Sequence, residues 1–226
     1  MGKKGRKSGW QAGGRSSPAS RIDIDLERMN PRKLSPAVDA LLGGGVIISP
    51  TDSVYSFLCI AGDKSAINRL RQIKGIANDH PLSLHCKDIS QASQFAVVDQ
   101  TGHRLLKRYC PGPYTIILPA KRDITKTLRQ KRQEVGVRIS NHALLSHLLA
   151  SVDQPLISTS VSMKSQDDEQ YDYVESSMID LEDIAARYLS EVDVLVDVGT
   201  IPNQLTTVLQ FVSGEVTCLR QGIGPV

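Results

Sequence analysis

The sequence predicts a single α/β domain built on a mixed sheet. Its hydrophobic content of 40% and charged content of 23% are ordinary for a soluble globular protein, and 226 residues permit one sizeable domain. Short β-branched runs alternate with helical periodicities along most of the chain, a pattern typical of sheets flanked by helices. Two strand-like runs then follow each other near the end and predict a hairpin. No apolar stretch approaches the ~18 residues that span a membrane, so we expect no membrane partner.

Six positive charges and no acidic residue lie in the first 21 residues. The remaining 205 residues hold 21 basic and 24 acidic side chains, a net charge of −3, so the positive excess lies in this basic leader. Residues 1–21 are rich in glycine and serine and poor in aliphatic side chains, which predicts a disordered segment. Two interpretations stay open: a solvated tail, or an arm that contacts nucleic-acid phosphates.

Local signals predict where the helices begin and end. The first helix is expected to start with Ser35 as its cap and Pro36 at its first position. Three aspartates, Asp63, Asp88 and Asp99, are expected to cap later helices. The helix after Asp63 should end at Gly75, which places Lys74 in its last turn. Further helices are expected at 142–152 and, after an acidic segment of eight carboxylates between 167 and 183, around Ile184 and Tyr188.

The strand that organises the chain is the apolar run Val46–Ile48, which follows three glycines. It is short and β-branched, and it should end at Pro50 because proline has no N–H for a ladder. Thr51-Asp52-Ser53 then places hydroxyls and a carboxylate at a strand end, where open α/β sheets bind ligands. An ordinary turn is the alternative. The other expected strands are 54–61, 82–86, 114–119, 135–139, 156–160, 192–198, 206–212 and 215–220.

Polar side chains recur at four of these strand ends, in 51–53, His85, Arg138/Ser140 and 158–162. Lys74 and Arg220 add positive charge at the ends of other elements. Hydroxyls and cations without a nucleophile–base pair suit an anionic ligand such as a nucleotide better than triad hydrolysis. Neither a P-loop nor a Rossmann fingerprint occurs, so the residues alone indicate only an anion site.

A second cluster of positive charge lies between residues 121 and 138. Its candidate RNA-binding members are Lys121, Arg122, Lys126, Arg129, Lys131 and Arg132. Such a run is either a solvated face or a patch that attracts a polyanion. The four cysteines form no CxxC pair, which predicts buried thiols in a reducing cytoplasm and no metal site.

Several motifs in order resemble the YrdC-like threonylcarbamoyl-adenylate synthase family. Ser49–Cys59, SPTDSVYSFLC, resembles its P-T-D-T-x-Y-G signature, and Lys74 with His80-Pro81-Leu82 resembles its K-x-R-x-x-x-[KN]-P-L. The remaining matches are Pro111–Thr115, Val135–Ile139, Thr159–Ser162, Thr206–Val208 and Leu219–Gly222. The resemblance covers about residues 33–224. It implies one domain with a twisted, largely parallel sheet and a positively charged concave surface.

The same resemblance implies an activity and a set of site residues. Family synthases combine L-threonine, bicarbonate and ATP, with Mg²⁺ as part of that substrate, into threonylcarbamoyl-AMP and pyrophosphate for tRNA modification. By resemblance, Ser53, His85 and Arg138 meet threonine. The residues that would meet ATP are Lys74, Ser140, Ser160, Ser162 and Arg220. No covalent intermediate is required, because the site has only to align a carbamate with the α-phosphate and offset charge.

This chain departs from the family motifs at functional positions. Ile76 stands where the motif has Arg, and Ser162 where it has Asn. The set of departures resembles the YciO-like branch of the family more than the main synthases. One lost charge-assisted contact costs about 1.5–3 kcal/mol, or roughly one to two powers of ten in rate. Arg71 or His80 is a candidate replacement for the missing charge. Two hypotheses stay open: a weak or specialised synthase, and a non-catalytic protein that binds tRNA or double-stranded RNA.

Overall fold

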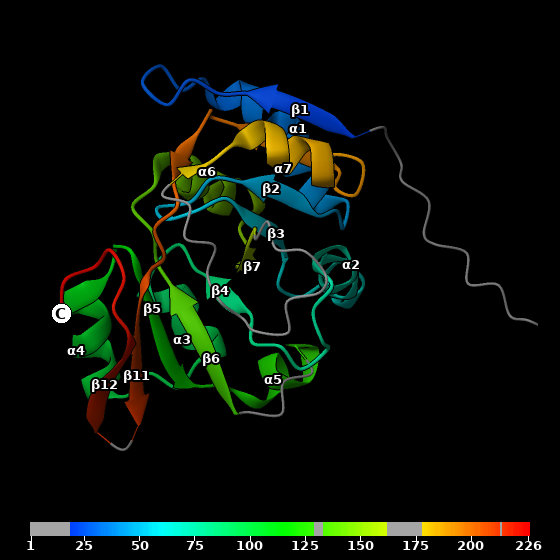
Figure 1. Ribbon diagram of the computed structural model, residues 1–226. Helices are drawn as coiled ribbons and strands as arrows, with labels where there is room; N and C mark the ends of the chain where they lie inside the picture. The colour runs from blue at the N-terminus through cyan, green and yellow to red at the C-terminus, as the bar shows by residue number, and fades with distance from the viewer. Residues whose placement is uncertain (1–18, 129–132, 162–177, 213) are drawn as a thin grey trace, which may run out of the picture.

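The computed structural model describes residues 19–128, 133–161, 178–212 and 214–226 (Figure 1). Ten strands form one sheet in the order β1-β9-β2-β3-β7-β4-β6-β5-β11-β12. These strands are β1 (Ser20–Asp23), β2 (Ile47–Ser49), β3 (Ser56–Ile60), β4 (Ser83–His85), β5 (Tyr114–Pro119), β6 (Glu134–Arg138), β7 (Leu156–Ser160), β9 (Val194–Asp197), β11 (Thr207–Val212) and β12 (Glu215–Arg220). A small second sheet pairs β8 (Met178–Ile179) with β10 (Ile201–Pro202). The predicted α/β class is confirmed.

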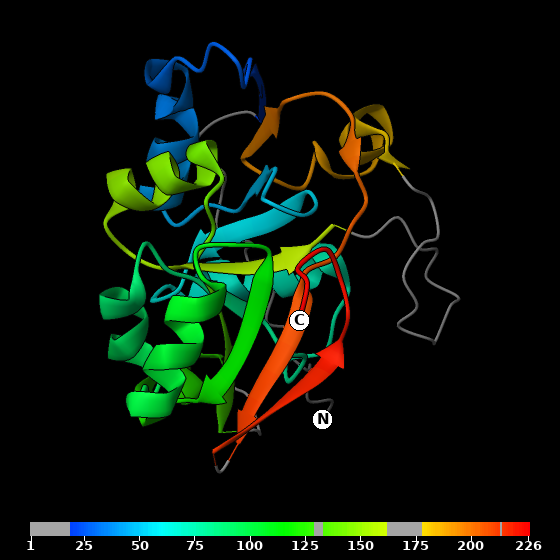
Figure 2. The same ribbon diagram turned by 90° about the vertical axis from the view of Figure 1, so that its left-hand side faces the viewer.

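The sheet is mixed and twisted, as predicted. Within the described residues its neighbouring strands make four parallel and five antiparallel pairings. The twist is visible in Figure 2, where β2 and β3 (cyan) lie across the view while β5 (green) and β11 (orange) run steeply. The predicted terminal hairpin is β11 and β12, whose register shifts between Val208 and Leu209.

Helices cover both faces of the sheet. They are α1 (Ser35–Leu42), α2 (Lys64–Lys74), α3 (Ile89–Phe95), α4 (Gln100–Tyr109), α5 (Arg122–Leu128), α6 (Ala143–Val152) and α7 (Leu181–Tyr188). The side chains of Asp63, Asp88 and Asp99 accept backbone hydrogen bonds at the starts of α2, α3 and α4, so the predicted caps are confirmed. Gly75 ends α2 with a left-handed φ of 71°, a conformation that glycine adopts without strain. None of the helices in the described part is long and apolar enough to cross a membrane.

The prediction that Ser35 caps the first helix is wrong. A 3₁₀ turn, η1 (Pro31–Leu34), precedes α1, and the side chain of Asn30 caps that turn. Ser35 therefore lies inside the helical run, where its hydroxyl donates to the carbonyl oxygen of Arg32 at 2.9 Å. A serine before a proline resembles a cap in sequence, but the preceding turn had already started the helix.

Strand β1 changes the boundary of the expected leader. Ser20 and Arg21, its last two residues, pair in parallel with β9. Arg21 also donates to Asp197 at 2.8 Å and to Glu182 at 2.6 Å, so its charge holds an edge strand in place. Residues 1–18 lie outside the described residues, and the prediction of disorder there stays a prediction.

The core consists of two apolar clusters, one on each face of the sheet. Helices α1 and α6 pack over one face, where Leu41 and Leu148 meet Ile47 and Leu58. The other five helices contribute to the cluster on the opposite face. Because side chains alternate along a strand, the face under α1 and α6 continues across β7, β4, β6 and β5. There it becomes polar, and this polar part contains the candidate site.

Candidate functional site

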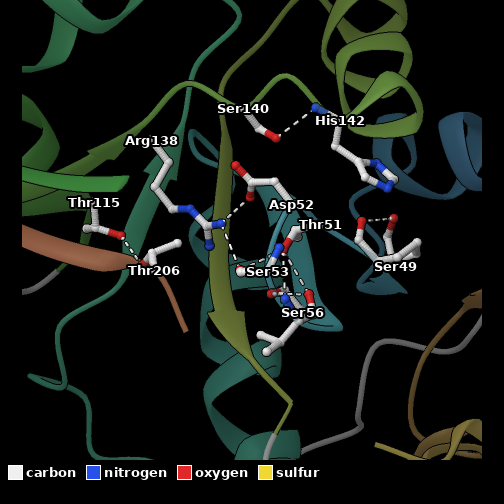
Figure 3. A network of polar contacts seen from close by, with 12 residues as sticks. Ser49, Thr51, Asp52, Ser53, Ser56, Thr115, Arg138, Ser140, His142 and Thr206 are labelled. Atoms are coloured by element: carbon white, nitrogen blue, oxygen red, sulfur yellow. Dashed lines mark hydrogen bonds and ion pairs between the residues drawn. The ribbon is translucent and has the colours of Figure 1, made fainter. Parts of the chain in front are cut away.

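The turn after β2 is built around the hydroxyl of Thr51 (Figure 3). Its Oγ1 donates to the Val54 carbonyl at 2.8 Å and accepts from the backbone N–H groups of Ser53 and Val54. The Ser53 hydroxyl lies 3.0 Å from the same oxygen. These contacts fix the turn without a regular ladder, because Pro50 ends the strand as predicted. Asp52 and Ser53 are therefore held with their side chains toward the end of β6.

Arg138, the last residue of β6, donates from Nη2 to Asp52 Oδ1 at 2.5 Å and to Ser53 Oγ at 3.0 Å. Both charged side chains are more than nine-tenths buried. Burial lowers the pKa of Arg138, and the Asp52 carboxylate opposes that effect. One atom on each partner, Asp52 Oδ2 and Arg138 Nε, is buried without a hydrogen-bond partner. The pair is therefore held in place while one acceptor and one donor remain without a hydrogen bond.

His85 lies beside Arg138 in the parallel register of β4 and β6. Its side chain is fully buried, and neither ring nitrogen has a hydrogen-bond partner. Burial and the neighbouring Arg138 cation hold the pKa of His85 well below its usual range, so the imidazole is neutral. The structure thus brings together all three predicted threonine-site residues, Ser53, His85 and Arg138.

Sequence analysis missed a second histidine, His142, just before α6. Its backbone N–H donates to Ser140 Oγ at 3.0 Å, so the nearly buried Ser140 shapes the turn between β6 and α6. The ring Nδ1 is buried without a partner. Burial lowers the pKa of His142, although Asp52 works against this. The sequence feature that could have identified His142 is its position four residues after Arg138, which ends a predicted strand.

Hydroxyl groups line the rest of this polar face. Ser158 pairs in register with Ser83, and Ser160 with Ser56. Ser158 is buried, whereas Ser160, a predicted ATP-binding residue, is half-buried. Across β6, Thr115 Oγ1 lies 2.9 Å from Thr206 Oγ1. Arg220 donates to the Thr206 carbonyl from Nη2 at 2.9 Å and from Nε at 3.2 Å. Arg220 is therefore linked to the hydroxyl face through Thr206.

Lys74 approaches from the other face of the sheet. Its ammonium donates to Thr159 Oγ1 at 2.6 Å, and the alternation along β7 puts Thr159 opposite to Ser158 and Ser160. Burial lowers the pKa of Lys74 to about 8. The described contacts do not join Lys74 to the Arg138 group.

Arg71 and His80, the candidate replacements for the motif arginine that Ile76 replaces, lie in environments that do not suit this role. Arg71 is 2% exposed and donates from Nη2 to the Leu128 carbonyl at 2.6 Å, which ties α2 to α5. Burial and the nearby Lys74 and Arg71 lower the pKa of His80, which favours its neutral form. Ile76 is partly buried against the core cluster. Neither Arg71 nor His80 therefore offers a ready cation in place of the arginine.

Several predicted site residues lie outside the described residues: Ser162, Arg129, Lys131 and Arg132. Most of the acidic segment 167–183 lies outside them as well. The other candidate RNA-binding residues, Lys121, Arg122 and Lys126, are exposed at and within α5. Within the described residues, no group of three or more His, Cys, Asp or Glu side chains could hold a metal ion.

Known proteins resemble this chain in both sequence and structure. The YciO protein of Escherichia coli, which is uncharacterised, is 32% identical over 204 residues, covering 90% of this chain and 95% of that protein. Its crystal structure superposes with a TM-score of 0.77 over 92% of this chain and 98% of YciO. The threonylcarbamoyl-AMP synthase of Vibrio vulnificus is 33% identical over 136 residues, which is 59% of this chain and 73% of the synthase.

A larger protein shares the fold. The structure of P. abyssi Sua5 complexed with L-threonine has a TM-score of 0.76 and 23% identity, and covers 89% of this chain and 57% of Sua5. The family model for Sua5, YciO and YrdC proteins, described as "Telomere recombination", matches residues 39–222. This chain belongs to the Sua5/YciO/YrdC family, whose members include threonylcarbamoyl-AMP synthases.

Proposed function

We propose that the protein is a threonylcarbamoyl-AMP synthase, slow or specialised relative to the main synthases. It would combine L-threonine, bicarbonate and Mg²⁺-bound ATP into threonylcarbamoyl-AMP and pyrophosphate, a product used in tRNA modification. The observation that carries the proposal is the buried Arg138–Asp52–Ser53 group, which has unused polar atoms beside the neutral His85. The crystal structure of P. abyssi Sua5 with L-threonine supports threonine as the ligand class.

An amino acid with a side-chain hydroxyl suits the unused atoms of this group. A buried donor or acceptor without a partner costs about 1–3 kcal/mol, so a ligand that satisfies it gains that free energy on binding. Arg138 can bind a carboxylate through charge-assisted hydrogen bonds, and Asp52 Oδ2 can accept from an amine. A neutral imidazole at His85 can donate to or accept from a hydroxyl.

We propose that ATP binds along the hydroxyl-lined face next to this group. Ser160, Thr115 and Thr206 can donate to phosphate or ribose oxygens, and Arg220 brings a cation to the same face. Gly136 keeps the space between Ser83 and Thr115 open, since a side chain there would begin 3.0 Å from the Thr115 methyl group. Alignment of a carbamate with the α-phosphate and stabilisation of its charge are the two tasks left to such a site.

Lys74 and Ile76 explain why a slow rate is expected. Lys74 would have to leave Thr159 to reach a phosphate on the other face, and its low pKa leaves part of the population uncharged near pH 8. Ile76 supplies no charge, and Arg71 is committed to Leu128. Each missing charged contact lowers the rate by roughly one to two powers of ten.

Pyrophosphate release tests this proposal. The full chain is assayed with ATP, Mg²⁺ and bicarbonate, with and without L-threonine, beside Arg138→Met and, as a control, Arg28→Met at an exposed arginine. We expect threonine-dependent release that Arg138→Met abolishes and Arg28→Met leaves intact, together with a gain in Ile76→Arg. Release that does not depend on threonine, or no release from either the native protein or Ile76→Arg, would overturn the synthase proposal.

RNA binding stays a second candidate because Lys121, Arg122 and Lys126 are exposed in one helical region. Each phosphate contact that is lost flattens the dependence of log K on log salt by about 0.7–0.9. We expect a triple Lys121→Ala/Arg122→Ala/Lys126→Ala variant to flatten the salt dependence of tRNA binding. Deletion of residues 1–18, which keeps Arg21 in β1, tests the leader in the same assay. If neither variant changes the slope of log K against log salt, neither α5 nor residues 1–18 contacts the phosphates of tRNA.

We also propose a cytoplasmic location. All four cysteines are free thiols. Cys59 and Cys86 are buried as predicted, whereas Cys110 is half-buried and Cys218 is exposed, so the prediction of a buried thiol is wrong for Cys218. Free thiols are typical of reducing compartments. Fractionation of cells that express the tagged full chain is the direct test, and recovery with secreted proteins would contradict it.

A further inference from the structure

We infer that His142 accepts the proton from the α-ammonium group of the amino-acid substrate. The inference rests on the proposed function, because it concerns the chemistry of the same site. L-threonine carries a protonated amine at neutral pH, and a protonated amine has no lone pair with which to attack carbon. A carbamate can therefore form only after a nearby base has removed one proton.

The geometry puts a suitable base beside the carboxylate-binding group. Figure 3 shows the Asp52 side chain between the Arg138 guanidinium and the His142 ring. A substrate whose carboxylate meets Arg138 has its amine one carbon further on, on the side of Asp52 and His142. The Nδ1 atom is buried and has no partner, so it can accept a proton in the Nε2–H tautomer. The hydrogen bond from His142 N–H to Ser140 Oγ holds the start of α6 in place.

The groups around His142 suit this role electrostatically. Asp52, from the turn after β2, faces the ring, and Arg138 of β6 lies beyond that carboxylate. His85 of β4 and Cys110, before β5, also lie near the pair; burial keeps His85 neutral and raises the pKa of Cys110 to about 11, so neither adds a charge. Burial favours the neutral imidazole before the reaction, while Asp52 stabilises the imidazolium that forms afterwards.

The step balances without a further reagent. The proton moves from the α-nitrogen to Nδ1, and its bonding electrons stay on nitrogen as a lone pair. That lone pair attacks the carbon of bicarbonate and forms the C–N bond. The hydroxyl group of bicarbonate leaves with the second amine proton as water, which gives the carbamate that attacks the α-phosphate of ATP.

Two neighbouring groups are poorer candidates. His85 is fully buried beside Arg138, so its protonation would place two cations together without solvent. The Asp52 carboxylate is already bound to Arg138, so it is occupied as the counter-ion of the guanidinium. His142 is only half-buried, and it faces a carboxylate instead of a cation.

The test compares His142→Asn with the control His147→Asn, which alters another histidine of the α6 segment. An asparagine keeps a polar atom near the Nδ1 position but cannot take a proton. Threonine-dependent pyrophosphate release is measured over a pH range that brackets the pKa of imidazole and of the substrate amine. We expect His142→Asn to lose roughly 10²-fold in kcat at neutral pH with little change in threonine affinity. The deficit should shrink once the pH exceeds the pKa of the substrate amine, while His147→Asn behaves as the native protein.

The outcomes separate this inference from the proposed function. If neither the native protein nor Ile76→Arg shows threonine-dependent turnover, the synthase proposal fails and this inference falls with it. Turnover that is unaffected in His142→Asn, or reduced equally at every pH, overturns only the role of His142. Long-range ¹H–¹⁵N spectra of the native protein give an independent readout should the variant not fold. The Nδ1 signal of His142 should be unprotonated at neutral pH and shift when L-threonine is added, and an unperturbed signal would contradict the inference.

Discussion

Replacement of Lys74 by methionine should stabilise the fold at neutral pH while it impairs the proposed reaction. The Lys74 ammonium lies largely buried at the end of α2, and the contact that the structure describes for it is the hydroxyl of Thr159 at 2.6 Å. A hydroxyl replaces only part of the hydration that an ammonium loses on burial. Methionine has a similar length and carries no charge, so it removes the desolvation penalty and keeps the apolar packing.

The size of the effect follows from the pKa. Burial lowers the pKa of Lys74 from its ordinary 10.5 to about 8, a difference of about 2.5. At 1.36 kcal/mol for each pKa unit, the charged form is disfavoured in the folded state by roughly 3 kcal/mol. The hydrogen bond to Thr159 is lost in the variant, which offsets about 1 kcal/mol. We therefore expect Lys74→Met to raise the free energy of unfolding by about 2 kcal/mol at pH 7.

The stabilisation expected for Lys74→Met depends on pH. Between about pH 8 and pH 10.5 the unfolded chain keeps a proton on Lys74 that the folded chain has released, so the stability of the native protein rises with pH in this window. The advantage of Lys74→Met is therefore complete below about pH 8 and absent above about pH 10.5. Urea unfolding at several pH values measures it, with Lys64→Met, an exposed lysine of α2, as the control. Destabilisation at pH 7, or an advantage that persists at the highest pH, would show that burial of the Lys74 charge does not cost the folded state this free energy.

Two further predictions concern the fold around the site. Asp52→Asn should lower stability by about 3 kcal/mol, because it leaves the buried Arg138 without its counter-ion, and addition of Arg138→Met should restore much of the loss in urea unfolding. Equal stability of the single and double variants would contradict this. Gly222→Ala should cost about 1–3 kcal/mol, since its Cβ would lie against the Leu205 carbonyl, whereas Gly62→Ala has open space and should be neutral or slightly stabilising in thermal melts. Equal melting temperatures for the two alanine variants would show that the backbone near Gly222 moves to make room for the added methyl group.

Local signals explain which parts of the fold were predictable. The caps at Asp63, Asp88 and Asp99, the left-handed Gly75 and the strand end at Pro50 each depend on a few neighbouring residues. Such features are encoded within one turn of the chain. Strand β1 was missed because its pairing partner β9 lies more than 170 residues away, and Ser20–Asp23 carries no apolar run of its own.

The site was predictable only in part. Ser53, His85 and Arg138 come from three separate parts of the chain, and only the motif resemblance groups them in the sequence. Resemblance could not show that the Asp52 carboxylate forms an ion pair with Arg138. Nor could it show that Lys74 donates to Thr159 on the face of the sheet opposite to Arg138. These arrangements depend on tertiary packing and strand register, which a single sequence does not specify.

Direct detection of the product tests the proposed synthase activity. The native protein is incubated with ATP, Mg²⁺, ¹³C-bicarbonate and L-threonine, and the mixture is analysed by mass spectrometry beside Arg138→Met. We expect threonylcarbamoyl-AMP that carries one ¹³C, formed only when L-threonine is present and, of these two proteins, only by the native one. The absence of this adduct, or an equal amount from Arg138→Met, would show that the Arg138 group does not support threonylcarbamoyl-AMP synthesis.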